Sequence, residues 1–236
     1  MTEIEWWEFD SAEKLAEQAA GDIGFVVESA LEAHGGARLA LPGSAAIDLI
    51  AKQLLRNKLD WSKVTVVPTD DRLVMLDDPL SRFGHLESLF AGSGAELVSL
   101  VDEAALGDHG EAGRLADARL ARLDGPLDLV CLLMDEEGHV AGLLPGPDLE
   151  RALSGPRERR AVGVRADAAS GEPAAERVTL TAAALASARA VMVVLHGDEN
   201  KQRLERAIED GPLSKSPVGR LLADLETPVD IFWSAE

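Results

Sequence analysis

Three acidic residues, a glycine and a histidine follow directly on an apolar run of the chain. The run is Leu127–Met134, and the polar residues are Asp135–His139. A histidine at the end of a buried strand can act as a general base near neutral pH. Glu137 is a candidate partner because a carboxylate fixes the tautomer of an imidazole and raises its basicity. The alternative is an exposed loop histidine without a catalytic role.

A short turn, Pro42–Ser44, leads into a predicted helix and could bind an anion. Amide groups at a helix N-terminus and the Ser44 hydroxyl can donate hydrogen bonds to an anion, and Gly43 lets the backbone approach closely. The alternative is an ordinary capped turn.

A second polar turn, Asp70-Asp71-Arg72, follows a β-branched run, and Arg82 begins the next predicted helix. A planar guanidinium can hold a phosphate through two hydrogen bonds, so Arg72 and Arg82 are candidate phosphate ligands, with Asp70 beside them. The alternative is a surface pair of acids that neutralises its own arginine.

A third candidate cation, Lys201, follows the buried run Val191–Leu195 and its turn. Lys201 could bind a phosphate, or it could pair with Glu205 one helical turn away. No two histidines have metal-ligand spacing with an acid, so we expect no metal site.

Helical and strand patterns alternate along the chain, which predicts an α/β fold with a mainly parallel, open, Rossmann-like sheet and helices on both faces. Ligands of such sheets bind beyond the carboxyl ends of the strands, where the four polar turns should meet. The predicted strands are Arg38–Leu41, Lys63–Val67, Glu96–Val101, Leu127–Met134, Arg160–Val164, Arg177–Thr179, Val191–Leu195 and Val229–Trp233.

The composition indicates a globular protein of the cytoplasm. The 236 residues are 46% hydrophobic, which fits one α/β domain over residues 1–236 with a looser excursion around 154–175. A single cysteine, Cys131, excludes a disulfide framework. The net charge of −19 argues against nucleic-acid and membrane-surface partners. There is no apolar run long enough for a membrane span and no signal-peptide pattern.

The order of these motifs resembles the 6-phosphogluconolactonase family, which shares a superfamily with glucosamine-6-phosphate deaminase. The family's D-L-x-x-L-G-M-G-x-D-G-H-T-A-S-L-F-P is matched by residues 128–145, DLVCLLMDEEGHVAGLLP. The family's D-E-R corresponds to Asp70-Asp71-Arg72, and its R-V-T-L-T is intact at residues 177–181. Its Gly-then-Lys turn resembles Gly197 and Lys201, with one residue more between them.

The resemblance implies hydrolysis of a phosphorylated sugar lactone in the pentose phosphate pathway, without cofactor or metal. We expect a monomer or small homo-oligomer. His139 would deprotonate water, and Glu137 would take the place of the family's Asp. Arg72 and Lys201 would bind the phosphate or the developing oxyanion, helped by the Gly43-Ser44 turn. Two other functions stay open: a sugar-phosphate deaminase or isomerase, and a weakly active homologue that binds a ligand or partner.

The chain also departs from the family pattern inside its catalytic loop. Leu133 and Asp135 replace two glycines of the family motif, and Gly142 stands where the family has a serine. Asp135 would add negative charge beside a proposed anion site, which is expected to oppose substrate binding.

Overall fold

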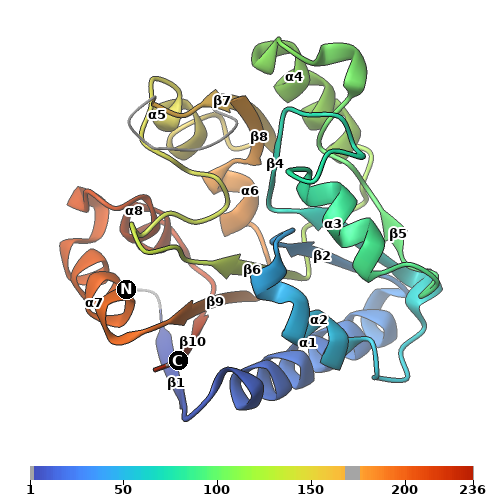
Figure 1. The fold of residues 1–236 in the computed structure, drawn as a ribbon, viewed down its shortest axis with the longest axis vertical. Coiled ribbons are helices and arrows are strands. Elements are labelled where there is room, and N and C mark those ends of the chain that lie inside the picture. Colours follow the sequence, from blue (N-terminus) through green and yellow to red (C-terminus); the bar gives the residue numbers. More distant parts are fainter. Residues whose placement is uncertain (1–2, 168–175, 236) are drawn as a thin grey trace.

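A seven-stranded parallel sheet lies at the centre of the computed structural model, which describes residues 3–167 and 176–235 (Figure 1). Its strand order is β1-β10-β9-β6-β2-β3-β5, and neighbouring strands pair in parallel throughout. The strands are β1 (Ile4–Phe9), β2 (Ala37–Leu41), β3 (Val64–Pro68), β5 (Glu96–Leu97), β6 (Leu129–Leu133), β9 (Val191–His196) and β10 (Val229–Ser234). The predicted parallel α/β sheet is therefore confirmed.

A smaller antiparallel sheet stands beside the main one. It consists of β4 (Asp70–Arg72), β8 (Glu176–Leu180) and β7 (Ala161–Arg165) in the order β4-β8-β7. The sequence predicted Asp70–Arg72 as a turn, because pairing with a strand more than 100 residues later leaves no local signal. Of the looser excursion predicted around 154–175, residues 168–175 lie outside the described part.

Helices cover both faces of the main sheet, and each face has its own hydrophobic core. One face carries α1 (Ala12–His34), α2 (Asp48–Leu54) and α3 (Arg82–Leu89). The other carries α4 (His109–Leu120), α5 (Leu149–Leu153), α6 (Ala182–Ala186), α7 (Asp198–Asp210) and α8 (Pro217–Ala223). Within the described ranges, no helix has both the length and the apolar character needed to cross a membrane.

Local sequence explains the ends of the longest helix, α1. The Ser11 side chain accepts a hydrogen bond from the Lys14 backbone N–H at 3.4 Å, which caps the N-terminus. Gly35 ends the helix with a φ of 79°, a conformation that glycine adopts without steric cost.

Two strands differ from the prediction. Glu96–Val101 is a strand only at Glu96–Leu97, and the edge strand β1 was not predicted from the sequence.

The strand order brings the polar segments of the sequence together. β9, β6, β2 and β3 are consecutive neighbours and run parallel, so their carboxyl ends lie along one edge of the sheet. The loops after β6 and β2 and the residues after β3 therefore meet at this edge, as expected for an open α/β sheet.

Candidate active site

A pocket of about 110 Å³ lies at this edge of the sheet. Its walls come from the segments after β2, β3 and β6, from the start of α3 and from the small sheet. The lining includes Ser44, Arg82, Leu133, Asp135, His139 and Arg177. A candidate base and two arginines thus line the same pocket.

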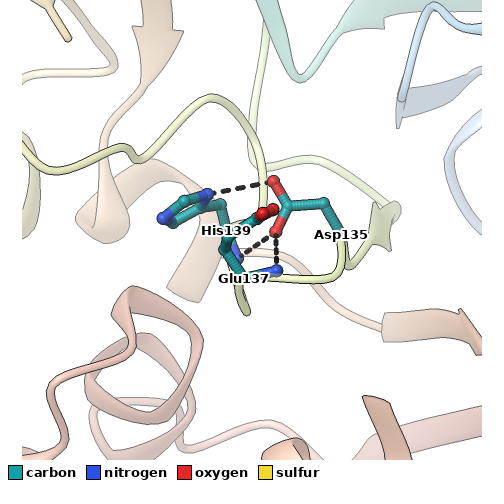
Figure 2. A group of neighbouring side chains, drawn as sticks. All are labelled: Asp135, Glu137 and His139. Atoms are coloured by element: carbon teal, nitrogen blue, oxygen red, sulfur yellow. Dashed lines mark hydrogen bonds and ion pairs between the residues drawn. The ribbon is translucent and has the colours of Figure 1, made fainter. Parts of the chain in front are cut away.

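His139 is held by a carboxylate through its ring nitrogen Nδ1. Asp135 Oδ2 lies 3.0 Å from His139 Nδ1 (Figure 2). With Asp135 ionised, Nδ1 carries the proton and Nε2 keeps its lone pair, which is the tautomer that a general base needs. The imidazole is shielded, with 14% of the side chain exposed, while the Asp135 side chain is 43% exposed.

The turn itself orients Asp135. Its Oδ1 accepts hydrogen bonds from the backbone N–H groups of His139, at 2.8 Å, and Glu137, at 3.0 Å. Gly138 closes the turn with a φ of +84°, and a Cβ there would lie 3.0 Å from Ser216 Oγ. The backbone of the loop therefore aims Oδ2 at the imidazole.

Asp135 stays ionised at neutral pH. Burial raises the pKa of its carboxyl group, but the hydrogen bonds from the His139 ring and backbone outweigh burial and hold the pKa below its ordinary value. The negative charge of Asp135 faces the imidazole of His139 at 3.0 Å and would stabilise an imidazolium there.

Glu137 does not occupy the position expected from the sequence. Its side chain is exposed, and the hydrogen bond to the imidazole comes from Asp135. One carboxylate oxygen each of Asp135 and Glu137 and a ring nitrogen of His139 lie within 4.8 Å of one another, so the three could offer ligands to a cation. Figure 2 shows the three side chains gathered at the turn. In this arrangement, however, Asp135 and His139 are bonded to each other.

Asp70 links two arginines at the wall of the pocket. Asp70 Oδ1 lies 3.2 Å from Arg82 Nη1, and Asp70 Oδ2 lies 3.5 Å from Arg177 Nη1. Asp70 is fully buried and Arg177 nearly so, at 0% and 1% exposed. Asp70 thus holds two guanidinium groups at the pocket wall, and guanidinium groups are suited to binding an anionic ligand.

The N-terminus of α3 holds Arg82 in place. The buried Asp71 carboxylate accepts hydrogen bonds from the backbone N–H groups of Arg82, at 2.7 Å, and Phe83, at 3.1 Å. Burial raises the pKa of the Asp71 carboxyl group to about 6, although these backbone hydrogen bonds lower it. Gly43 packs on the same segment, since a Cβ there would lie 2.2 Å from Arg82 O.

Ser44 Oγ and Arg82 Nε are buried polar atoms of the pocket lining that have no hydrogen-bond partner among the described residues. A buried polar group left unpaired costs about 1–3 kcal/mol. Both residues line the pocket, so a ligand with anionic oxygens there can accept hydrogen bonds from them.

Comparison with known proteins gives the same family as the motifs. The family model for glucosamine-6-phosphate isomerases/6-phosphogluconolactonase matches residues 10–231. A 6-phosphogluconolactonase from Rhizobium meliloti is 32% identical over 96% of this chain and 97% of its own length. One from Pseudomonas putida is 31% identical over 96% of this chain and 91% of its own length.

This chain belongs to the 6-phosphogluconolactonase family. The crystal structure of a 6-phosphogluconolactonase from Shewanella baltica superimposes with a TM-score of 0.89 at 26% identity, covering 100% of this chain and 98% of that one. The family resemblance seen in the motifs is thus confirmed in sequence and in fold.

Two cations expected from the family pattern do not line the pocket. Arg72 Nη1 donates to Leu80 O at 3.3 Å. Lys201 Nζ lies 2.5 Å from Glu8 Oε1 and 4.3 Å from the centre of the Trp233 ring. The structure therefore does not bring Arg72 and Lys201 to His139.

Lys201 and its neighbour Asn200 point to different faces at the start of α7. Each residue of an α-helix adds about 100° of rotation, so a shift by one position turns a side chain toward another face. Lys201 faces the β1 side, whereas Asn200, one residue earlier, lines a cavity next to the catalytic loop.

Arg177 is the site residue that the sequence analysis missed. The other residues of β8, Glu176–Leu180, are two polar and two apolar ones, so no local pattern marks Arg177 as buried. A buried arginine needs an anionic partner. That partner, Asp70, comes from β4, which the sequence did not predict as a strand.

The serine-to-glycine departure in the catalytic loop also has a structural account. Gly142 has a φ of +64°, and a Cβ there would lie 2.4 Å from Asp70 Oδ2. The preceding Ala141 has its carbonyl held by Thr179 Oγ1 at 2.5 Å. Glycine at 142 therefore lets the loop pack directly on the carboxylate that links the two arginines.

Proposed function

We propose that this protein hydrolyses 6-phosphogluconolactone to 6-phosphogluconate, with His139 as the general base. The observation that carries the proposal is one pocket lined by a carboxylate-paired imidazole and by two guanidinium groups. Relatives of nearly the same length carry the name 6-phosphogluconolactonase. Their substrate is a phosphorylated ester, and the pocket supplies a base for the ester and positive charge for the phosphate.

The reaction begins when His139 Nε2 removes a proton from water as the oxygen attacks the lactone carbonyl. The carbonyl oxygen becomes an oxyanion, and Asp135 stabilises the imidazolium. When the intermediate collapses, the bond between the carbonyl carbon and the ring oxygen breaks, and the imidazolium returns its proton to that oxygen. The product is the open-chain acid, so one water is consumed and His139 is regenerated.

Arg82, Arg177 and the Ser44 hydroxyl serve as donors to the anionic oxygens of the substrate. Arg82 Nε and Ser44 Oγ are buried donors whose hydrogen bonds a ligand would complete. Donors fixed in advance stabilise developing charge without reorganisation, which is the largest single contribution in many enzymes. General base catalysis adds about 10²–10⁴-fold.

The test is hydrolysis of 6-phosphogluconolactone by the purified protein, corrected for spontaneous opening of the lactone. We expect a rate well above background that falls by about 10²–10⁴-fold in His139→Ala. Gluconolactone without its phosphate serves as the matched substrate and should give a much lower kcat/KM. A wild-type rate equal to background would overturn the proposal, and so would an unchanged rate in His139→Ala.

A further inference from the structure

A second and larger cavity lies away from the catalytic pocket. Its volume is about 510 Å³, against about 110 Å³ for the pocket, and the two share no lining residue. It opens between the main sheet at Val67, the end of α4 at Leu120, β8 at Leu180 and α6 at Ala184. Sites for small organic molecules span about 300–1,000 Å³ and are mostly apolar.

The rim of this cavity is basic although the protein is acidic. Arg38, Arg157 and Arg160 line it against a single acid, Glu158, in a chain with a net charge of −19. A negatively charged small molecule would therefore be attracted to this basic rim.

The three arginines differ in how far hydrogen bonds and ion pairs within the protein already engage their guanidinium groups. Arg160 Nη1 donates to the carbonyls of Leu120 and Leu123, at 2.5 and 3.0 Å, and so closes the end of α4. Arg38 Nη1 lies 4.0 Å from Asp128 Oδ2.

Arg157 is the guanidinium that is open to a ligand. Asp128, which lies beside Arg38, also contacts His34 Nε2 at 3.0 Å and Arg189 Nε at 3.3 Å. The carboxylate of Asp128 is therefore shared between Arg38 and these two side chains. Arg157 is exposed, and in the described ranges no hydrogen bond or ion pair is recorded for it.

We propose that this cavity binds a small organic anion with an apolar body. The apolar part lies against Leu120, Leu123 and Leu180, and the anionic group is bound by Arg157 with Arg38 behind it. The apolar floor distinguishes this ligand from the sugar phosphate of the catalytic pocket, because sugar hydroxyls would have to give up their hydrogen bonds to water there.

The test is isothermal titration calorimetry with anilinonaphthalene sulfonate, an aromatic anion. Two variants change the cavity: Arg157→Glu reverses the rim charge, and Ser187→Trp places an indole at an exposed position of the lining. We expect Arg157→Glu to weaken binding at least tenfold, since a charge-assisted hydrogen bond is worth about 1.5–3 kcal/mol. We expect Ser187→Trp to weaken binding about as much, because the indole would take the space of the apolar body. Circular dichroism checks that both variants fold.

Two controls locate the binding. Arg206→Glu makes the same charge change on α7, outside the cavity, and His139→Ala removes the base of the catalytic pocket. Both should bind the probe as the wild type does. The proposal is overturned if the wild type shows no saturable binding or if all four variants bind with wild-type affinity. It is also overturned if only one cavity variant weakens binding, because the apolar body and the anion must act together.

Discussion

Replacing Asp135 by Asn should remove most of the catalytic rate while leaving the fold intact. In the wild type, Oδ1 accepts two backbone hydrogen bonds and Oδ2 faces His139 Nδ1 at 3.0 Å. An Asn side chain has only one oxygen, and the two backbone donors hold it. Its NH₂ group then faces Nδ1, which must become an acceptor, so the proton moves to Nε2 and the base is lost.

The tautomer effect adds to the loss of charge. Two unit charges 3 Å apart interact by about 1.4 kcal/mol at the dielectric constant of water, which corresponds to about tenfold in rate. That value is a lower bound, because only 14% of the His139 side chain is exposed. Fixing the wrong tautomer blocks proton transfer itself, which costs on the order of 10²–10⁴-fold in kcat.

The assay is steady-state lactone hydrolysis by Asp135→Asn beside the matched variant Glu137→Gln. Glu137 lies on the same loop and carries the same charge, but the imidazole is bonded to Asp135. We expect Asp135→Asn to lose at least 100-fold in kcat and Glu137→Gln to stay within a few-fold of the wild type. If Glu137→Gln loses the activity and Asp135→Asn keeps it, the reasoning about the turn is wrong.

Three further predictions concern the surroundings of the base. Arg82→Ala should raise KM for 6-phosphogluconolactone about tenfold or more by removing a charged donor, whereas Lys201→Ala should leave KM nearly unchanged. If steady-state kinetics give the two variants equal KM values, the placement of the two cations is wrong. Gly142→Ala should lower the unfolding free energy by about 1–3 kcal/mol, because its Cβ would lie 2.4 Å from Asp70 Oδ2; an unchanged Tm in a thermal melt would refute this. The pKa of Asp71 rises from 3.8 to about 6 on folding, so folded protein binds more protons between these values and stability falls as pH rises through them. Denaturant titrations at several pH values should show that the unfolding free energy of the wild type falls by up to about 3 kcal/mol relative to that of Asp71→Asn across that window. A difference in unfolding free energy that stays constant with pH would contradict this prediction.

The sequence was sufficient wherever a local pattern decides the structure. The apolar run before Asp135 predicts a buried strand, and alternating helices and strands predict a parallel sheet whose carboxyl edge collects the turns. β6 and the loop that carries His139 are found where these rules place them. Gly43, Ser44 and Arg82 also lie at this edge, as expected from turns that follow strands or open helices.

The sequence was insufficient wherever geometry across the fold decides. Which acid reaches His139 depends on how two backbone N–H groups orient Asp135, and residue spacing alone favoured Glu137. Lys201 contacts Glu8, which lies 193 residues away in sequence, so no local pattern predicts this pair. Arg177 joined the site through strand pairing and an ion pair with Asp70, which lies 107 residues away in sequence.

Chemical rescue of a histidine variant tests the central claim most directly. His139→Gly removes the imidazole but leaves Asp135 and the two arginines of the pocket in place. We predict that free imidazole, added to this variant, restores 6-phosphogluconolactone hydrolysis in a saturable manner, with no comparable gain for the wild type. If His139→Gly is as active as the wild type, or if imidazole accelerates only the spontaneous reaction, His139 is not the base.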